Sequence, residues 1–205
     1  MSDPTAGAEV PWYRRRGWLI GAAAVVVLAI TVVTDLPQHA SRPAQISSDT
    51  STMNAINAGV RSCAFAVSES LGLYQKERTH ALKAGNLAVA PGLLRDDQNA
   101  CSFTSEAIFT LSNLELPGSV AGKYLQRLVG TVTTWATSDG LAAVEAIETL
   151  WNTPRDQRAL RSLSSAERHL ADDRIIAVTD VQAADRALRA TLPAIALPRV
   201  VPSPG

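Results

Sequence analysis

The sequence predicts an all-α protein: a single N-terminal transmembrane helix followed by an extracytoplasmic antiparallel four-helix bundle with a kinked third helix. Three observations predict this class: an uncharged run that follows three arginines, four segments with apolar residues at helical spacing, and no credible pair of strands. We divide the 205 residues into a cytoplasmic tail (1–16), a transmembrane signal anchor (17–34), a juxtamembrane linker (35–48), the bundle (49–192) and a proline-rich extended tail (193–205).

Residues 17–34 (GWLIGAAAVVVLAITVVT) carry no charged side chain. A helix of that length is about 27 Å long, close to the thickness of the hydrocarbon core of a bilayer. Arg14, Arg15 and Arg16 directly precede it. Because basic flanks stay on the cytoplasmic side, they predict a single-pass protein of the cell membrane with its N-terminus inside and its remainder outside. The lipid bilayer is therefore a predicted partner.

Two kinds of cleaved export signal are the main alternatives. An ordinary signal peptide has an apolar core of 7–15 residues and small residues before the cut, whereas this run is longer and Gln38-His39-Ala40 begins with a large residue. Arg15-Arg16 followed by Gly-Trp-Leu is similar to a twin-arginine signal, but Trp18 stands at the aromatic position. Either signal would release an exported soluble protein. A buried helix of a globular core is a further alternative.

The linker and the first two helices follow from composition and spacing. Residues 36–48 are rich in proline and serine and lack apolar periodicity. A first helix is expected from near Asp49 or Ser51 until just before Gly85, and a second over about 93–113. The inward apolar stripe of the first helix is Ile56, Val60, Cys63, Val67, Leu71 and Tyr74. The stripe of the second helix is Leu94, Cys101, Ile108 and Leu111.

The third and fourth helices carry longer stripes. Ser119 is the expected N-cap of the third, and residues 138–140 (Ser-Asp-Gly) predict its kink, because glycine disfavours a helix interior. Thr153 and Pro154 are expected to open the fourth helix. Residues 175–179 (IIAVT) have strand propensity, but helical spacing continues on both sides. The apolar stripe of the third helix is Val120, Tyr124, Leu128, Val132, Trp135, Val144, Ile147 and Trp151. The stripe of the fourth helix is Leu160, Leu163, Leu170, Ala177, Val181, Ala184 and Leu188.

The tail that follows is proline-rich. Four prolines fall between residues 193 and 205. Proline blocks helix and removes backbone donors, so an extended, mostly unpaired segment is expected.

Cys63 and Cys101 lie on the inward stripes of two successive helices. An even pair at facing positions outside the cytoplasm is most simply a disulfide, and small neighbours such as Ala64 and Ala100 would let the two helices approach. Two buried free thiols, or a bridge between chains, are the alternatives. No CxxC motif is present, so thioredoxin-like chemistry has little support.

The histidines are the first place to look for chemistry. Glu77 and His80 have the ExxH spacing of di-iron bundles, but the motif occurs once, among basic residues, so a solvated face is expected. His169 stands near Asp172 and Asp173, which would suit a metal or acid–base site. The adjacent basic residues, Arg168 and Arg174, favour a solvated, ion-paired face instead.

The remaining acidic residues give weak signals. Asp96 and Asp97 suit the positive N-terminal end of the second helix. Glu145 and Glu148 share a helix face without a proton partner nearby. No GxSxG, phosphate-loop or dinucleotide motif is present. We therefore expect no catalytic residues, no metal site and no cofactor.

The charge balance excludes a further class. The chain has 19 basic and 19 acidic residues, and 16 of each remain after residue 35, so a nucleic-acid-binding protein is not expected. Only three of the basic residues are lysines, namely Lys76, Lys83 and Lys123, and together with the abundant alanine this is typical of a GC-rich bacterial gene.

These observations favour a non-enzymatic, membrane-tethered domain that binds a partner or acts as a scaffold in the bacterial cell envelope. The alternative is a sensor-like domain that binds a small ligand in a pocket near Trp135, Asp139 and Gly140, where the kink could open the bundle.

Overall fold

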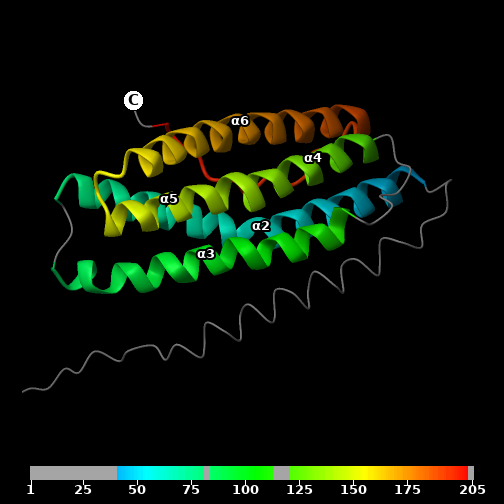
Figure 1. Cartoon of the computed structure of the whole chain (residues 1–205). Helices are drawn as coiled ribbons and strands as arrows, with labels where there is room; N and C mark the ends of the chain where they lie inside the picture. Colours follow the sequence, from blue (N-terminus) through cyan, green and yellow to red (C-terminus); the bar gives the residue numbers. More distant parts are fainter. Residues whose placement is uncertain (1–40, 81–83, 113–120, 203–205) are drawn as a thin grey trace, which may run out of the picture.

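The computed structural model describes residues 41–80, 84–112 and 121–202. All regular secondary structure in these residues is helical, and four helical segments form an antiparallel bundle (Figure 1). The third helical segment runs from Gly122 to Asn152 and contains a π-helical turn at the position of the predicted kink. The predicted all-α class with four helices is confirmed. The elements are α2 (Arg42–Arg78), α3 (Ala84–Ser112), α4 (Gly122–Thr134), the π-helix η1 (Trp135–Gly140), α5 (Leu141–Asn152) and α6 (Gln157–Leu188).

The predicted anchor at residues 17–34 and the arginines at 14–16 lie outside the described residues. Among the helices that the structure describes, none is both long enough and apolar enough to span a bilayer. The anchor therefore stays a prediction.

Helix α2 begins earlier than the sequence analysis expected. It starts at Arg42, so the part of the predicted linker from residue 42 to residue 48 is helical. Pro43 lies in the first turn, where its missing N–H needs no helical partner. The helix ends at Arg78, and His80 has a left-handed backbone with φ of 52°. The predicted end at Gly85 is wrong, since that residue belongs to α3.

Two other helix starts were also misplaced. Helix α3 begins at Ala84, not near residue 93 as predicted, and it runs through Pro91 without a break. Helix α6 begins three residues after Pro154, because the Asp156 carboxylate accepts hydrogen bonds from the amides of Arg158 and Ala159 and is the N-cap. Residues 175–179 lie inside α6, as the helical spacing predicted.

The predicted stripes form the core wherever burial is described. The side chains buried on them are Ile56, Val60, Cys63, Val67, Leu71, Leu94, Cys101, Leu128, Val132, Trp135, Val144, Ile147, Leu163, Leu170, Ala177, Val181, Ala184 and Leu188. Tyr74, Tyr124, Trp151 and Leu160 are partly buried against them.

The C-terminal segment is extended, as predicted, but it is docked on the bundle. It runs back along α6 (red in Figure 1), and its Leu192, Leu197 and Val200 side chains are buried. Asn57 of α2 donates to the carbonyl of Ala194 (2.9 Å) and accepts from the amide of Ala196 (2.8 Å).

Two side chains of α6 also hold this segment. Arg174 donates to the carbonyl of Leu197 (3.1 Å), and Asp185 accepts from the amide of Leu192 (2.7 Å). Helices α2 and α6 scarcely touch each other directly, so the segment fills the space between them. The sequence predicted an extended tail but not its docking on the bundle. The docking could not be predicted because it depends on side chains that are far away in the sequence.

Candidate functional site at the π-helix

The π-helix η1 is the irregular element of the bundle core. It spans residues 135–140, where the Ser-Asp-Gly sequence predicted a kink, and α4 and α5 continue from its two ends. A π-turn inserts one extra residue and rotates the helix face that follows, which explains why the apolar stripe is displaced after residue 138. Such turns are frequent at functional sites, so the residues around η1 were the first candidates.

Trp135 and Gly140 fill the interior at this position. The Trp135 ring is fully buried, and its Nε1 donates to the carbonyl of Leu170 in α6 (3.2 Å). A Cβ at Gly140 would lie 3.0 Å from the carbonyl oxygen of Trp135, 3.1 Å from Cys63 Sγ and 3.2 Å from a Val67 methyl carbon. Protein atoms thus occupy the space that a ligand beside Gly140 would need.

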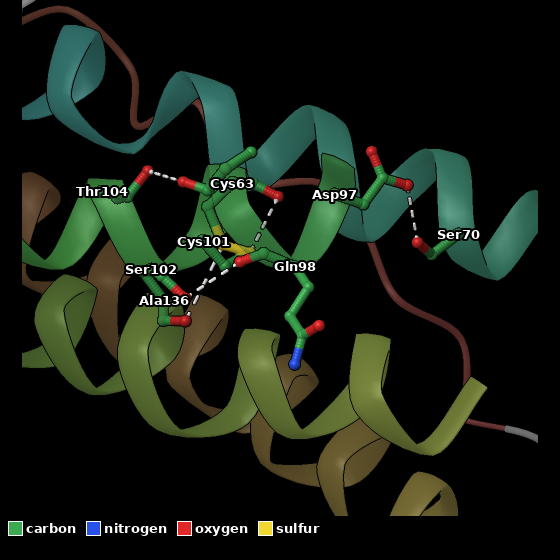
Figure 2. Close-up of a disulfide and its surroundings, with 9 residues drawn as sticks. Cys63, Ser70, Asp97, Gln98, Cys101, Ser102, Thr104 and Ala136 are labelled. Carbon is green, nitrogen blue, oxygen red and sulfur yellow. Dashed lines mark hydrogen bonds between the residues drawn. A yellow bond between two sulfur atoms is a disulfide. The ribbon is translucent and has the colours of Figure 1, made fainter. Parts of the chain in front are cut away.

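The predicted cysteine pair packs against the same turn. Cys63 of α2 and Cys101 of α3 come together at disulfide distance, with 4.3 Å between their Cα atoms (Figure 2). Cys63 Sγ lies 3.7 Å from the carbonyl oxygen of Ala136 in η1, a contact without a donated proton because both sulfurs are bonded. The covalent link between α2 and α3 therefore adjoins the irregular turn of the third helical segment.

Asp139 of η1 meets two residues of α6. The Asp139 carboxylate is mostly buried, and its Oδ1 lies 3.4 Å from Nδ1 of the exposed His169. Asp173 Oδ2 is buried without a hydrogen-bond donor. Burial, with the carboxyl groups of Asp139 and Asp172 nearby, raises the pKa of Asp173 to about 6. A proton shared between the carboxyl groups of Asp139 and Asp173 would supply the missing donor and link η1 to α6.

The arginines on this face have other partners. The sequence analysis expected Arg168 and Arg174 to form a solvated, ion-paired face with the neighbouring acids. Instead, the Arg168 Nε donates to the carbonyl of Ser164 (3.1 Å), and the Arg174 Nε donates to Leu197 in the tail. Arg168 is exposed, as expected, but neither arginine forms an ion pair with another described residue, because a long arginine side chain on a helix can reach backbone carbonyls as readily as a carboxylate.

A second buried carboxyl lies beside the disulfide. Ser70 Oγ donates to Asp97 Oδ2 across 2.7 Å and links α2 to α3 (Figure 2). Burial raises the pKa of Asp97 to about 7, although the hydrogen bond from Ser70 acts in the opposite direction. Asp97 was expected to serve the end of a helix, but it lies within α3 and holds two helices together.

The other candidate residues do not form a site. His80 is exposed beyond the end of α2, with Glu77 in the last turn. Glu145 is exposed and accepts from Gln98 Nε2 (3.2 Å). Over residues 41–80, 84–112 and 121–202, no group of three histidine, cysteine or acidic side chains is arranged to hold a metal ion.

A surface hollow lies where the first turn of α2 meets the last turn of α6. It has a volume of about 290 Å³ and is lined by Arg42, Gln45, Ala187, Leu188 and Arg189. None of the residues predicted to form a ligand pocket contributes to it.

The residues of the Asp139 cluster were each noticeable in the sequence, but not as one site. Asp139 marks the predicted kink, and His169 stands near Asp172 and Asp173 along the chain. The signal that α6 and η1 face each other at this register was the buried Trp135, whose indole N–H needs an acceptor on a neighbouring helix.

Comparison with protein families, with curated proteins and with solved structures finds no match for this chain.

Proposed function

We propose that this protein is a single-pass, membrane-anchored helical domain on the outer side of the bacterial cell membrane, and that it acts by binding another envelope protein. The observation that carries the proposal is the distribution of polar and apolar groups on the bundle. Buried polar groups hold helices together, while several large apolar side chains lie on the surface.

Several buried polar groups are engaged in holding the fold together. The Trp135 indole bonds to α6, Asp97 bonds to α2, and Asp180 pairs with Arg127 between α6 and α4. Asn57 holds the C-terminal segment. A group that is already committed to holding two helices is poorly placed to move protons or bind a substrate, which favours a binding role over catalysis.

The surface carries the complementary feature. Phe65 and Phe103 each expose 66% of their area, and Ile175 and Ile176 are exposed side by side in α6. Exposed aromatic and aliphatic side chains are typical anchors of protein–protein contacts.

Two observations favour the location. The cysteine pair at disulfide distance suits an oxidising compartment, since disulfides are rare in the cytosol. The uncharged run at residues 17–34 and the preceding arginines favour an anchor with the bundle outside.

A reporter fused to the C-terminus tests the topology. A periplasm-type reporter should be active and a cytoplasmic reporter silent, and the protein should stay in the membrane fraction after a carbonate wash. Activity of the cytoplasmic reporter would contradict the orientation. Release of a shortened chain into the soluble fraction would favour a cleaved export signal.

Photo-crosslinking in cells tests the binding role. A photoreactive phenylalanine analogue placed at Phe65, at Phe103 and at Ile176 is compared with the same analogue at Ser162, an exposed polar position of α6. At least one apolar position should capture a discrete protein that Ser162 does not. Identical adducts at all four positions, or none at the apolar ones, would contradict the proposal.

A further inference from the structure

One end of the bundle brings together the first turn of α2, the first turn of α4 and the last turn of α6 (Figure 1). The Arg42 guanidinium joins two of these turns, because its Nη2 donates to the carbonyls of Leu188 (3.0 Å) and Arg189 (3.1 Å). These carbonyls end α6 and lack helical partners, so Arg42 closes α6 from the start of α2.

This end is also where the chain enters the bundle. Seven residues, 35–41, separate the predicted anchor from α2. At no more than about 3.6 Å per residue they can span at most about 25 Å, whatever their conformation. Helix α2 has 37 residues and is therefore about 55 Å long. An anchored chain must therefore hold the Arg42 end within about 25 Å of the bilayer surface.

The side chains at this end are basic, and their acidic neighbours are engaged. The basic residues are Arg42, Lys123, Arg127, Arg186 and Arg189. Asp180 pairs with Arg127, and Asp185 accepts from the amide of Leu192. Within the part of the chain that the structure describes, the exposed side chains of Arg186 and Arg189 have no ion-pair partner.

Helix electrostatics explain only part of this arrangement. Cations are favourable at the C-terminal end of a helix, which suits Arg186 and Arg189. Arg42 and Lys123, however, lie in the first turns of α2 and α4, at the positive ends of those helices, where cations are disfavoured. Clustering of cations at both kinds of helix end points to an anionic surface outside the bundle.

The hollow described above lies within this basic end. Two arginines, Arg42 and Arg189, line it together with Gln45 and the apolar residues Ala187 and Leu188. Arginine donates planar, paired hydrogen bonds that match phosphate oxygens, and it is the side chain most suited to phosphate recognition. A phosphodiester with an apolar neighbour fits this lining.

We propose that this basic end docks on anionic phospholipid, with Arg186, Arg189 and the rim of the hollow contacting the phosphate headgroups. The proposal rests on the proposed function, because only an anchored chain holds this end at a membrane. A basic residue near an anionic bilayer contributes about a fivefold preference for it, and the effect is screened within about one Debye length.

Arginine labelling tests the proposal with the full chain reconstituted in lipid nanodiscs. Phenylglyoxal modification of each arginine is followed by peptide mass spectrometry in nanodiscs of phosphatidylcholine alone and in nanodiscs with phosphatidylglycerol. Arg186 and Arg189 should be modified about fivefold more slowly with the anionic lipid. Arg155 and Arg158, which flank Asp156 at the opposite end of α6, are the matched control and should not change.

Three outcomes would overturn it. If Arg186 and Arg189 are modified at the same rate in both lipids, the docking proposal is contradicted, but the proposed membrane anchor is not. Protection by soluble glycerol phosphate in phosphatidylcholine nanodiscs, with no further effect of anionic lipid, assigns the end to a free anion. Failure of the full chain to enter nanodiscs refutes the anchor itself and, with it, this proposal.

A pair of variants gives an independent readout. Arg186→Gln/Arg189→Gln should lower the enrichment of phosphatidylglycerol around the reconstituted chain by about fivefold or more. Arg155→Gln/Arg158→Gln removes the same charge from the far end and should leave the enrichment unchanged. Circular dichroism of both variants checks that the bundle is folded, and equal enrichment in the two would contradict the assignment.

Discussion

Helix α2 is joined to α3 and to α6 in contrasting ways. On the α3 side the helices approach closely, with 4.3 Å between Cα atoms at the cysteine pair, and the buried side chains Ala64 and Ala66 lie next to Cys63. On the α6 side the helices scarcely touch, and the C-terminal segment lies between them. We call these the close seam and the filled seam. Small side chains permit the first, and a wide gap requires the second.

The two seams use polar groups differently. In the close seam, Ser70 and Asp97 bond side chain to side chain. In the filled seam, an extended backbone meets helices whose own backbone groups are already paired, so side chains must supply its partners. Asn57 suits this role because its amide offers a donor and an acceptor, and it uses both on the segment.

The largest expected effect is on the close seam. Replacing both cysteines (Cys63→Ala/Cys101→Ala) opens a loop of 38 residues and should lower the free energy of unfolding by roughly 3–4 kcal/mol. Urea unfolding measures this, and the m-value should rise because the unfolded chain becomes more open. A reducing agent should reproduce the effect in the natural sequence and change nothing in the double variant.

Removing the C-terminal segment from the filled seam should lower the free energy of unfolding by a somewhat smaller amount. Truncation after Ala190 removes the buried Leu192, Leu197 and Val200, and we expect a loss of about 2–4 kcal/mol, because burial of each is worth about 1.5–3 kcal/mol but ordering the segment offsets part of it. Here the m-value should fall, since less surface is buried. Truncation after Pro202 is the control. If it is as destabilising as the longer cut, the docked side chains are not the cause.

Two glycine-to-alanine substitutions in the third helical segment should change stability by smaller amounts. One position is crowded and lies beside the close seam, and the other is open. Gly140→Ala places a methyl group within 3.0–3.2 Å of Trp135, Cys63 and Val67, and it should destabilise the bundle by about 1–3 kcal/mol. Gly130→Ala in α4 meets nothing within 4 Å and should stabilise it by about 0.5–1 kcal/mol. Thermal unfolding of the two variants should therefore shift in opposite directions, and a shared direction would show that η1 can relax.

A further expected effect is the dependence of stability on pH. The pKa of Asp97 is raised to about 7 and that of Asp173 to about 6, from an ordinary value of 3.8. Folding therefore favours their protonated forms, whose contribution is complete below about pH 4 and is lost as the pH rises through 6 and 7. The midpoint of urea unfolding should fall between pH 5 and 7.5.

Single substitutions show which of the two carboxyl groups causes the pH dependence of stability. Asp97→Asn should remove most of it, since an amide keeps the acceptor for Ser70 without a charge, and Asp173→Asn should remove the part near pH 6. An unchanged slope in both variants would mean that other groups titrate.

The helices and their inward faces were predictable because apolar periodicity is a local property of the chain. The stripe through Val60, Cys63 and Val67 predicted both the core face of α2 and the cysteine that faces α3. Helix ends were less predictable: Pro43 and Pro91 suggested boundaries, but Pro43 lies in the first turn of α2, where no helical hydrogen bond is lost, and Pro91 lies inside α3.

The candidate site was only half predictable. The glycine at position 140 indicated an irregular turn, but its π-helical form depends on close packing against Cys63 and Val67. The link from Asp139 to His169 and Asp173 depends on the register between η1 and α6, about 30 residues apart in sequence. No local pattern carries that register.

The sequence by itself determined the helical class, the inward face of each helix, the position of the kink and the cysteines that meet, since each follows from residue spacing or backbone chemistry along one segment. Only the tertiary structure decided that the proline-rich tail fills a seam, that Asn57 and Arg174 hold it, and that two carboxyls titrate near neutral pH. These features depend on the distances between helices, which are set by how all the side chains of the core pack at once.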